Sequence, residues 1–124
     1  MSLHEDDVAL LKDIIDYSIK IIKSTKGVKY YYFESNSEKI AANERYLHII
    51  GEAARKISNE TRTKLANIPW KKMIGLRNKL AHDYGEILIS RIWLTSQTSI
   101  PELVNELQKI DELKEYIQKV IKDV

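Results

Sequence analysis

The sequence predicts an all-α fold, and two observations support that prediction. Apolar residues recur at three- and four-residue spacing, the period of an amphipathic helix, and no segment shows the alternation of a half-buried strand. Hydrophobic residues make up 44% and charged residues 31% of the chain, with four Gly and two Pro, a composition that excludes collagen-like and low-complexity proteins. At 124 residues one core is expected, so residues 1–124 are predicted to form a single domain, an antiparallel four-helix bundle.

The first two helices are predicted over residues 5–25 and from Ser37 to about Ser58. Gly27 follows the first helix as a stop signal, and Ser37 with Glu38 suits the start of the second. The apolar stripe of the first helix consists of Val8, Leu11, Ile14, Ile15, Ile19 and Ile22. Each helix therefore has one face for a shared core.

The third helix is predicted to start at Pro69, a residue favoured in a first turn, and to end near Gly85. The fourth covers roughly residues 88–99. Pro101 then indicates a kink or a fresh start, after which the apolar period continues to Val120. We expect one long final helix in two parts.

The connection between the first two helices contains four consecutive aromatic residues, Tyr30 to Phe33. So much aromatic surface is not expected to remain in water. It either packs over the end of the bundle or contacts another subunit or partner, because aromatic residues are enriched at the centres of interfaces.

Cysteine usage and hydropathy indicate a cytoplasmic protein. The chain has no Cys, which excludes disulfides, thiolate zinc sites and cysteine nucleophiles and suits a reducing compartment. No apolar run approaches the ~18 residues that span a bilayer, and the N-terminal segment is acidic rather than signal-like. We expect no export and no membrane association.

The residues give no indication of a metal or a cofactor. The three His, at positions 4, 48 and 82, lack the spacing of metal ligands, and His48 with Glu52 suits an ordinary i,i+4 surface pair. The chain has no glycine-rich phosphate loop, nucleophile elbow or dinucleotide fingerprint. Nucleotide hydrolysis and dinucleotide chemistry therefore lack support.

The charge is unevenly distributed, although the formal net charge is only +2. Residues 61–82 contain no Asp or Glu but several basic residues, namely Arg62, Lys64, Lys71, Lys72, Arg77 and Lys79. This stretch is either a local positive patch or an ordinary solvated helix face, and charge alone does not separate the two.

Arg77 has the most unusual position in the third predicted helix. At ~100° per residue it lies in the middle of an apolar stripe. The residues within about 60° of it are Trp70, Met73, Ile74, Leu80, Ala81 and Tyr84. Burying an unpaired guanidinium is costly, so Arg77 either reaches a carboxylate such as Glu44 or Glu52, extends to the bundle edge, or serves a site at a cleft or dimer seam.

Asn78, His82 and Tyr84 gather with Arg77 over two turns of that helix. A guanidinium to hold a phosphate, an imidazole to take and give a proton, and an amide and a phenol to orient groups together suit phosphodiester cleavage by a neighbouring 2′-hydroxyl. That route requires no metal. The alternative for His82 alone is a capping histidine at the negative end of the helix dipole.

The string Arg77-Asn78-Lys79-Leu80-Ala81-His82-Asp83-Tyr84 resembles the R-N-x3-H-x-Y motif of the HEPN superfamily, specifically its HepT-like toxin family. Ile50-Gly51-Glu52-Ala53-Ala54 is similar to that family's I-G-E-A segment, and Ile68-Pro69-Trp70 to its entry into the motif helix. The resemblance covers about residues 4–120. The segment after Tyr84 is less diagnostic.

The resemblance implies a homodimer in which two motifs face each other across the subunit seam and form a metal-independent endoribonuclease site. Arg77 would bind the scissile phosphate of an mRNA or tRNA, and His82 would act as general acid and base. Asn78 would orient the site and Tyr84 would complete it. Glu52 and Glu44 would be supporting residues, and Lys71, Lys72 and Lys79 are candidate RNA contacts.

The resemblance also implies a cognate minimal nucleotidyltransferase as antitoxin, with Tyr84 as the AMP acceptor. An AMP group there would add bulk and negative charge where an RNA phosphate should lie. Two alternatives remain open. The chain could be a non-catalytic partner that offers Tyr84 to the transferase, or a scaffold dimer in which Arg77 belongs to a satisfied core ion pair.

Overall fold

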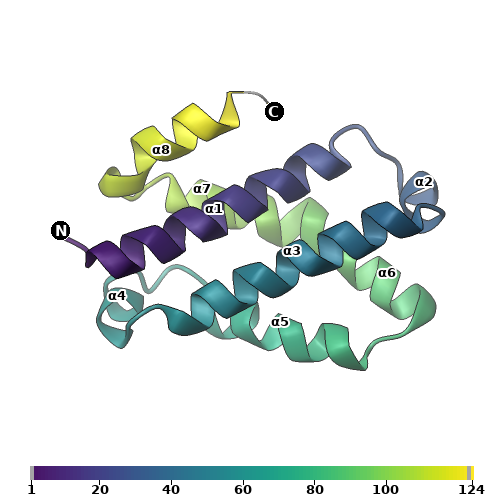
Figure 1. Cartoon of the computed structure of the whole chain (residues 1–124), viewed down its shortest axis with the longest axis horizontal. Helices are drawn as coiled ribbons and strands as arrows, with labels where there is room; N and C mark the ends of the chain where they lie inside the picture. The colour runs from purple at the N-terminus through teal and green to yellow at the C-terminus, as the bar shows by residue number, and fades with distance from the viewer. Residues whose placement is uncertain (1, 123) are drawn as a thin grey trace.

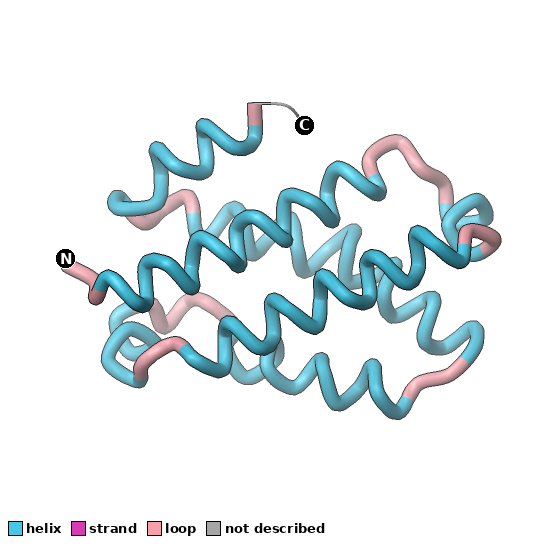
Figure 2. The backbone as a smooth tube through the Cα atoms, in the orientation of Figure 1, coloured by secondary structure: helices cyan, strands magenta, loops and turns pink. Residues whose placement is uncertain are grey.

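The computed structural model describes residues 2–122 and 124, and all regular structure in that part of the chain is helical (Figure 2). The elements are α1 (Glu5–Thr25), α2 (Tyr30–Glu34), α3 (Ser37–Lys56), α4 (Asn59–Lys64), α5 (Trp70–His82), α6 (Gly85–Leu94), the π-helical turn η1 (Thr95–Ser99), α7 (Ile100–Leu107) and α8 (Asp111–Ile121). The all-α prediction is confirmed. No helix among the described residues is long and apolar enough to cross a membrane.

The long helices α1 and α3 lie side by side and antiparallel (Figure 1). On its other sides α1 contacts α7 and α8, while α3 contacts α5. The chain then returns behind both through α6, η1 and α7 (Figure 1). The largest fully buried apolar side chains come from five of these helices and form one core: Leu11, Ile14, Ile15, Ile21, Phe33, Ile92, Leu107, Leu113 and Ile117.

The predicted boundaries of the first two helices are close to those observed. Gly27 has φ +72°, the left-handed conformation that a residue without a side chain adopts at little cost, and it follows the C-cap residue of α1, Lys26. Asn36, one residue before the predicted start, is the N-cap of α3, because its side chain accepts a hydrogen bond from the Lys39 amide at 3.0 Å. The short helices α2 and α4 were not predicted, because five or six residues carry too little periodic pattern.

The second half of the chain differs from its prediction at two places. The motif helix α5 ends at His82, and Gly85, at φ +54°, starts α6 instead of closing α5. The irregularity near Pro101 is the π-helical turn η1, whose wider turn relieves the clash of the proline ring with the preceding turn of the helix. The actual break follows at residues 108–110, where no Gly or Pro marks it.

The aromatic run contains two side chains that pack inward and two that are exposed. Phe33 is fully buried and its ring centroid lies 5.1 Å from that of Trp93, which Tyr30 also contacts edge-on at 5.7 Å. Tyr31 and Tyr32 stack on each other at 4.3 Å, and each is 59% exposed. Two of the four side chains therefore cover the end of the core, and the other two remain available at the surface.

Asp7, in the first turn of α1, is a buried carboxylate that holds the start of α4. It accepts hydrogen bonds from the Ser58 amide at 3.1 Å, the Ser58 hydroxyl at 2.6 Å and the Thr61 hydroxyl at 2.5 Å. Burial by itself would raise the pKa of Asp7, but the hydrogen bonds from Ser58 and Thr61 outweigh burial and hold it below its ordinary value of 3.8. The ionised form is therefore the one that stabilises the fold.

Replacing Asp7 by Asn should destabilise the protein by about 1–3 kcal/mol at neutral pH, because an amide cannot accept all three bonds. The folded-state pKa is depressed, so this contribution is present above pH 3.8 and is lost as the pH falls through the folded-state value. Urea unfolding at several pH values should show the wild type and Asp7→Asn converging in acid. Asp6→Asn, an exposed neighbour, is the control, and an equal loss in both variants would contradict the assignment.

Candidate active site

The four motif residues lie along the second half of α5 and the turn that follows it. Trp70, Met73 and Leu80 are buried and anchor the helix, and the Trp70 indole donates to the Leu65 carbonyl at 3.1 Å. Arg77, Asn78 and His82 are exposed, and Tyr84 is 80% exposed at the N-cap of α6. The motif side chains therefore form one accessible surface at the C-terminal end of α5.

Arg77 does not lie in the core, which corrects the predicted mid-stripe burial. Its side chain is 47% exposed, and Ala81 and Tyr84, which the wheel placed on the same stripe, are also exposed. The reason is that Met73 and Leu80 form the buried face of α5, and Arg77 lies at the edge of that face. Arg77 can therefore meet a ligand from solvent while it contacts α3.

Glu52 on α3 is the partner of the Arg77 guanidinium. The other Glu52 oxygen accepts from Arg55 at 3.3 Å. The hydrogen bond from Arg55 and the charge of Arg77 both lower the pKa of Glu52, with a smaller contribution from His48. Glu44, the other predicted partner, forms none of the ion pairs found in the described part of the chain, and His48 is not within ion-pair distance of Glu52.

Gly51, next to Glu52, brings α3 and α5 into close contact. A Cβ at this position would lie 3.2 Å from the Met73 carbonyl oxygen and 3.9 Å from the Arg77 Cβ. The absence of a side chain lets α5 approach α3 closely enough for Arg77 to reach Glu52. This packing gives a physical reason for glycine within the I-G-E-A segment.

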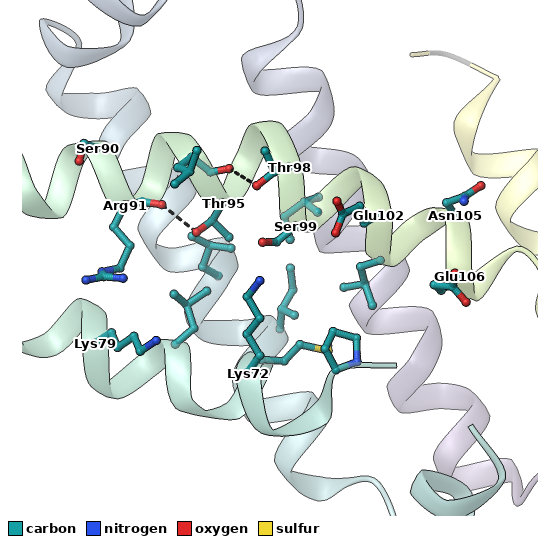
Figure 3. A pocket seen from close by; sticks show the side chains of 18 of the residues that line it. Lys72, Lys79, Ser90, Arg91, Thr95, Thr98, Ser99, Glu102, Asn105 and Glu106 are labelled. Atoms are coloured by element: carbon teal, nitrogen blue, oxygen red, sulfur yellow. Dashed lines mark hydrogen bonds between the residues drawn. The ribbon is translucent and has the colours of Figure 1, made fainter. Parts of the chain in front are cut away.

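The predicted RNA-contact lysines are all exposed, but they do not form one cluster. Lys72 and Lys79 line a groove of about 800 Å³ between α5 on one side and α6, η1 and α7 on the other (Figure 3). Lys71 is not among the residues that line this groove. Within residues 2–122 and 124, no three His, Asp or Glu side chains are grouped as metal ligands would be.

Comparison with known families decides which group of proteins this chain belongs to. Residues 14–110 match the family model described as "Ribonuclease HepT-like". The chain belongs to the HepT-like ribonuclease family. The match includes the I-G-E-A segment, α5 and the whole R-N-x3-H-x-Y string, so it confirms the resemblance inferred from those residues.

Relatives of this HepT-like chain have names of the same kind. Two proteins of Methanocaldococcus jannaschii, each named "Putative RNase", are 39% identical to it, over 105 and 103 residues; these matches span 85% and 83% of this chain and 87% and 94% of theirs. A Thermococcus cleftensis protein named "Probable ribonuclease HepT" is 31% identical over 100 residues, 81% of this chain and 91% of its own. No solved structure matched. The family and its relatives both indicate a ribonuclease.

Two residues beside the candidate site, Asp83 and Arg91, were not predicted from the sequence. Asp83, between His82 and Tyr84, accepts a hydrogen bond from the Arg91 Nε one helix later. This pair connects the turn after α5 to α6. It therefore holds the turn that contains Asp83 and Tyr84 in place relative to α6. The only sequence signal was the placement of an acidic residue within the motif, and its partner eight residues on shows no local pattern.

Proposed function

We propose that this chain is a metal-independent endoribonuclease toxin that cleaves RNA with Arg77 and His82 at a site completed by a second copy of the chain. The observation that carries the proposal is the surface at the end of α5, where a partly exposed guanidinium and an exposed imidazole lie on one helix. Asn78 lies between them in the sequence, Tyr84 follows them, and both are also exposed. Family membership supports the same activity.

The chemistry is an attack of the RNA 2′-hydroxyl on its neighbouring phosphorus. A base removes the 2′-hydroxyl proton, the new bond from O2′ to phosphorus forms, and the bond from phosphorus to O5′ breaks. An acid protonates the departing O5′, so the products carry a 2′,3′-cyclic phosphate and a 5′-hydroxyl. His82 supplies the proton transfers, and Arg77 stabilises the charge that develops on the phosphoryl oxygens.

A homodimer would supply this site with two imidazoles, one for each proton transfer. Each chain contributes one His to the motif, whereas the reaction needs a proton removed and a proton delivered. Tyr31 and Tyr32, each 59% exposed, offer a second copy of the chain an aromatic surface outside the motif. Exposed apolar residues of this size favour a protein contact.

We propose that the Tyr84 phenol is the point of control. A minimal nucleotidyltransferase would join the phenol oxygen to the α-phosphorus of ATP, with release of pyrophosphate and loss of the phenolic proton. Tyr84 makes no side-chain hydrogen bond within the described residues and is 80% exposed, so a transferase can reach it without unfolding the turn. The added phosphate would repel the RNA backbone beside Arg77.

The direct test is cleavage of mRNA and tRNA by the purified chain in excess EDTA, with chemical identification of the product ends. Mass spectrometry beforehand should establish that Tyr84 is unmodified. We expect cleavage that leaves 2′,3′-cyclic phosphate ends. No cleavage of either RNA class by the unmodified protein would contradict the nuclease proposal and favour the non-catalytic partner of a nucleotidyltransferase.

Adenylylation of Tyr84 should lower the cleavage rate at least about tenfold, because the bound phosphate adds charge where the substrate phosphate lies. Co-expression with a minimal nucleotidyltransferase should raise the mass of the wild type by whole AMP units. Tyr84→Phe should stay unmodified, and Tyr31→Phe, another exposed tyrosine, should be modified like the wild type. Modified protein that cleaves at the unmodified rate would contradict the switch.

A further inference from the structure

The groove between α5 and the α6–α7 segment has opposite charges at its two ends (Figure 3). Lys79 of α5 and Arg91 of α6 lie at one end, and Glu102 and Glu106 of α7 lie at the other (Figure 3). Lys72 projects into the space between them (Figure 3). The walls are largely apolar, with Leu76, Ile87, Leu94 and Leu103 among the residues that form them.

The basic end of the groove adjoins the catalytic motif. Lys79 lies three residues before His82 on α5, a spacing that makes the two side chains neighbours on the helix surface. Arg91 donates to Asp83, the residue that follows His82. The basic end of the groove therefore lies about one helical turn from His82.

The charges in this groove are mostly available for a ligand. Lys72, Lys79 and Glu102 form none of the ion pairs found among the described residues. Cations that converge on a concave surface without intramolecular partners favour an anionic ligand, and the carboxylates at the far end repel one. A ligand with a phosphate at one end and a neutral, flat body at the other matches this distribution.

We propose that this groove binds the nucleotide next to the scissile phosphate and selects a base that carries an exocyclic amino group. This inference rests on the proposed ribonuclease function and adds a specificity site to it. Lys79 holds the phosphate together with the Arg91 nitrogens that Asp83 does not occupy, and the apolar walls enclose the base. Glu102 accepts a hydrogen bond from the amino group, as acidic side chains do from the cytosine amine.

The dimensions and chemistry of the groove fit this occupant. Its volume of about 800 Å³ falls among those of small-molecule sites, and its walls combine apolar surface with polar side chains. Adenine, cytosine and guanine each present an exocyclic amine that can donate to the Glu102 carboxylate. Uracil has no exocyclic amine, and its single N3–H is flanked by two carbonyl oxygens that the carboxylate would repel. The structure therefore assigns Glu102 a role in disfavouring uridine.

The test measures binding separately from cleavage. Short 2′-O-methyl oligonucleotides lack the nucleophile and so remain intact; the set comprises an all-uridine strand and three strands in which one central residue is adenosine, cytidine or guanosine. Fluorescence anisotropy with the full chain should show the substituted strands binding about fivefold or more tightly than the all-uridine strand. Equal affinity for all four strands would overturn the proposal.

Glu102→Gln should weaken this discrimination, because the neutral amide can also donate to a uracil carbonyl. Glu115→Gln removes the same charge from an exposed position on α8 outside the groove and should preserve the discrimination. Glu102→Gln discriminating like the wild type would also overturn the proposal. Base discrimination without any RNA cleavage would support the proposed base selection and contradict the proposed nuclease activity. RNA cleavage without base discrimination would support the nuclease activity and contradict the base selection.

Discussion

Replacing His82 by Ala should reduce RNA cleavage by about 10²–10⁴-fold, because general acid–base catalysis contributes factors of that size. His82 is the last residue of α5, and its exposed side chain makes no hydrogen bond within the described part of the chain. Its loss should therefore leave the fold unchanged. The measurement is the rate of cleavage in EDTA beside the circular dichroism and thermal unfolding of the same samples.

His4→Ala is the matched control for this experiment. It removes another exposed imidazole, at the N-cap of α1, where the side chain makes no capping hydrogen bond. The N-terminus and the end of α5 lie at opposite ends of the molecule (Figure 1). Cleavage should persist in His4→Ala, and unchanged cleavage in His82→Ala would reject the proposed role of this residue.

The sequence predicted the fold class and the long helices well, because their apolar periods are long and their ends carry local signals. Gly27 after α1 and Pro69 before α5 are such signals, and the structure places helix ends beside both. Pro101 likewise signals the widened turn at Thr95–Ser99. The break at residues 108–110 had no equivalent signal, because it depends on how α7 and α8 pack on α1, which no local pattern encodes.

The candidate site was only partly accessible from the sequence. Helical spacing predicted that Asn78 and His82, four residues apart, share one side of the helix that also carries Arg77. This relation depends only on local geometry. The wheel overestimated the burial of Arg77, since it gives angles around α5 but not which neighbours cover each side. The Asp83–Arg91 pair and the position of Glu102 across the groove depend on tertiary packing. They could therefore not be predicted from residue spacing.

Replacing Arg77 by Met should reduce cleavage by about 10²–10³-fold, the usual loss when one donor to a developing oxyanion is removed. The Arg77 guanidinium uses one nitrogen on Glu52 and has further N–H groups for a phosphate. It can therefore keep its contact with α3 while it binds RNA. Arg77→Lys should recover only part of the activity, because a single ammonium cannot bind a phosphate with two parallel hydrogen bonds.

A scaffold in which Arg77 serves only its ion pair predicts a different result for the same variant. In that case Arg77→Met changes stability alone and leaves cleavage at the wild-type rate. Glu52→Gln tests the same distinction from the other side, because it weakens the ion pair but keeps the guanidinium. We expect Glu52→Gln to retain more activity than Arg77→Met, and equal losses would indicate that the pair, rather than the free donors of Arg77, matters.

Mixing an inactive variant with the wild type tests whether the second copy of the chain contributes to the site. If the His82 imidazoles of both subunits serve one composite site, a dimer of one wild-type chain and one His82→Ala chain lacks one of the two proton-transfer groups. Such mixed dimers should cleave RNA at well below half the wild-type rate. Cleavage at half the wild-type rate, in dimers shown to contain both chains, would confine each site to a single chain and contradict the composite arrangement.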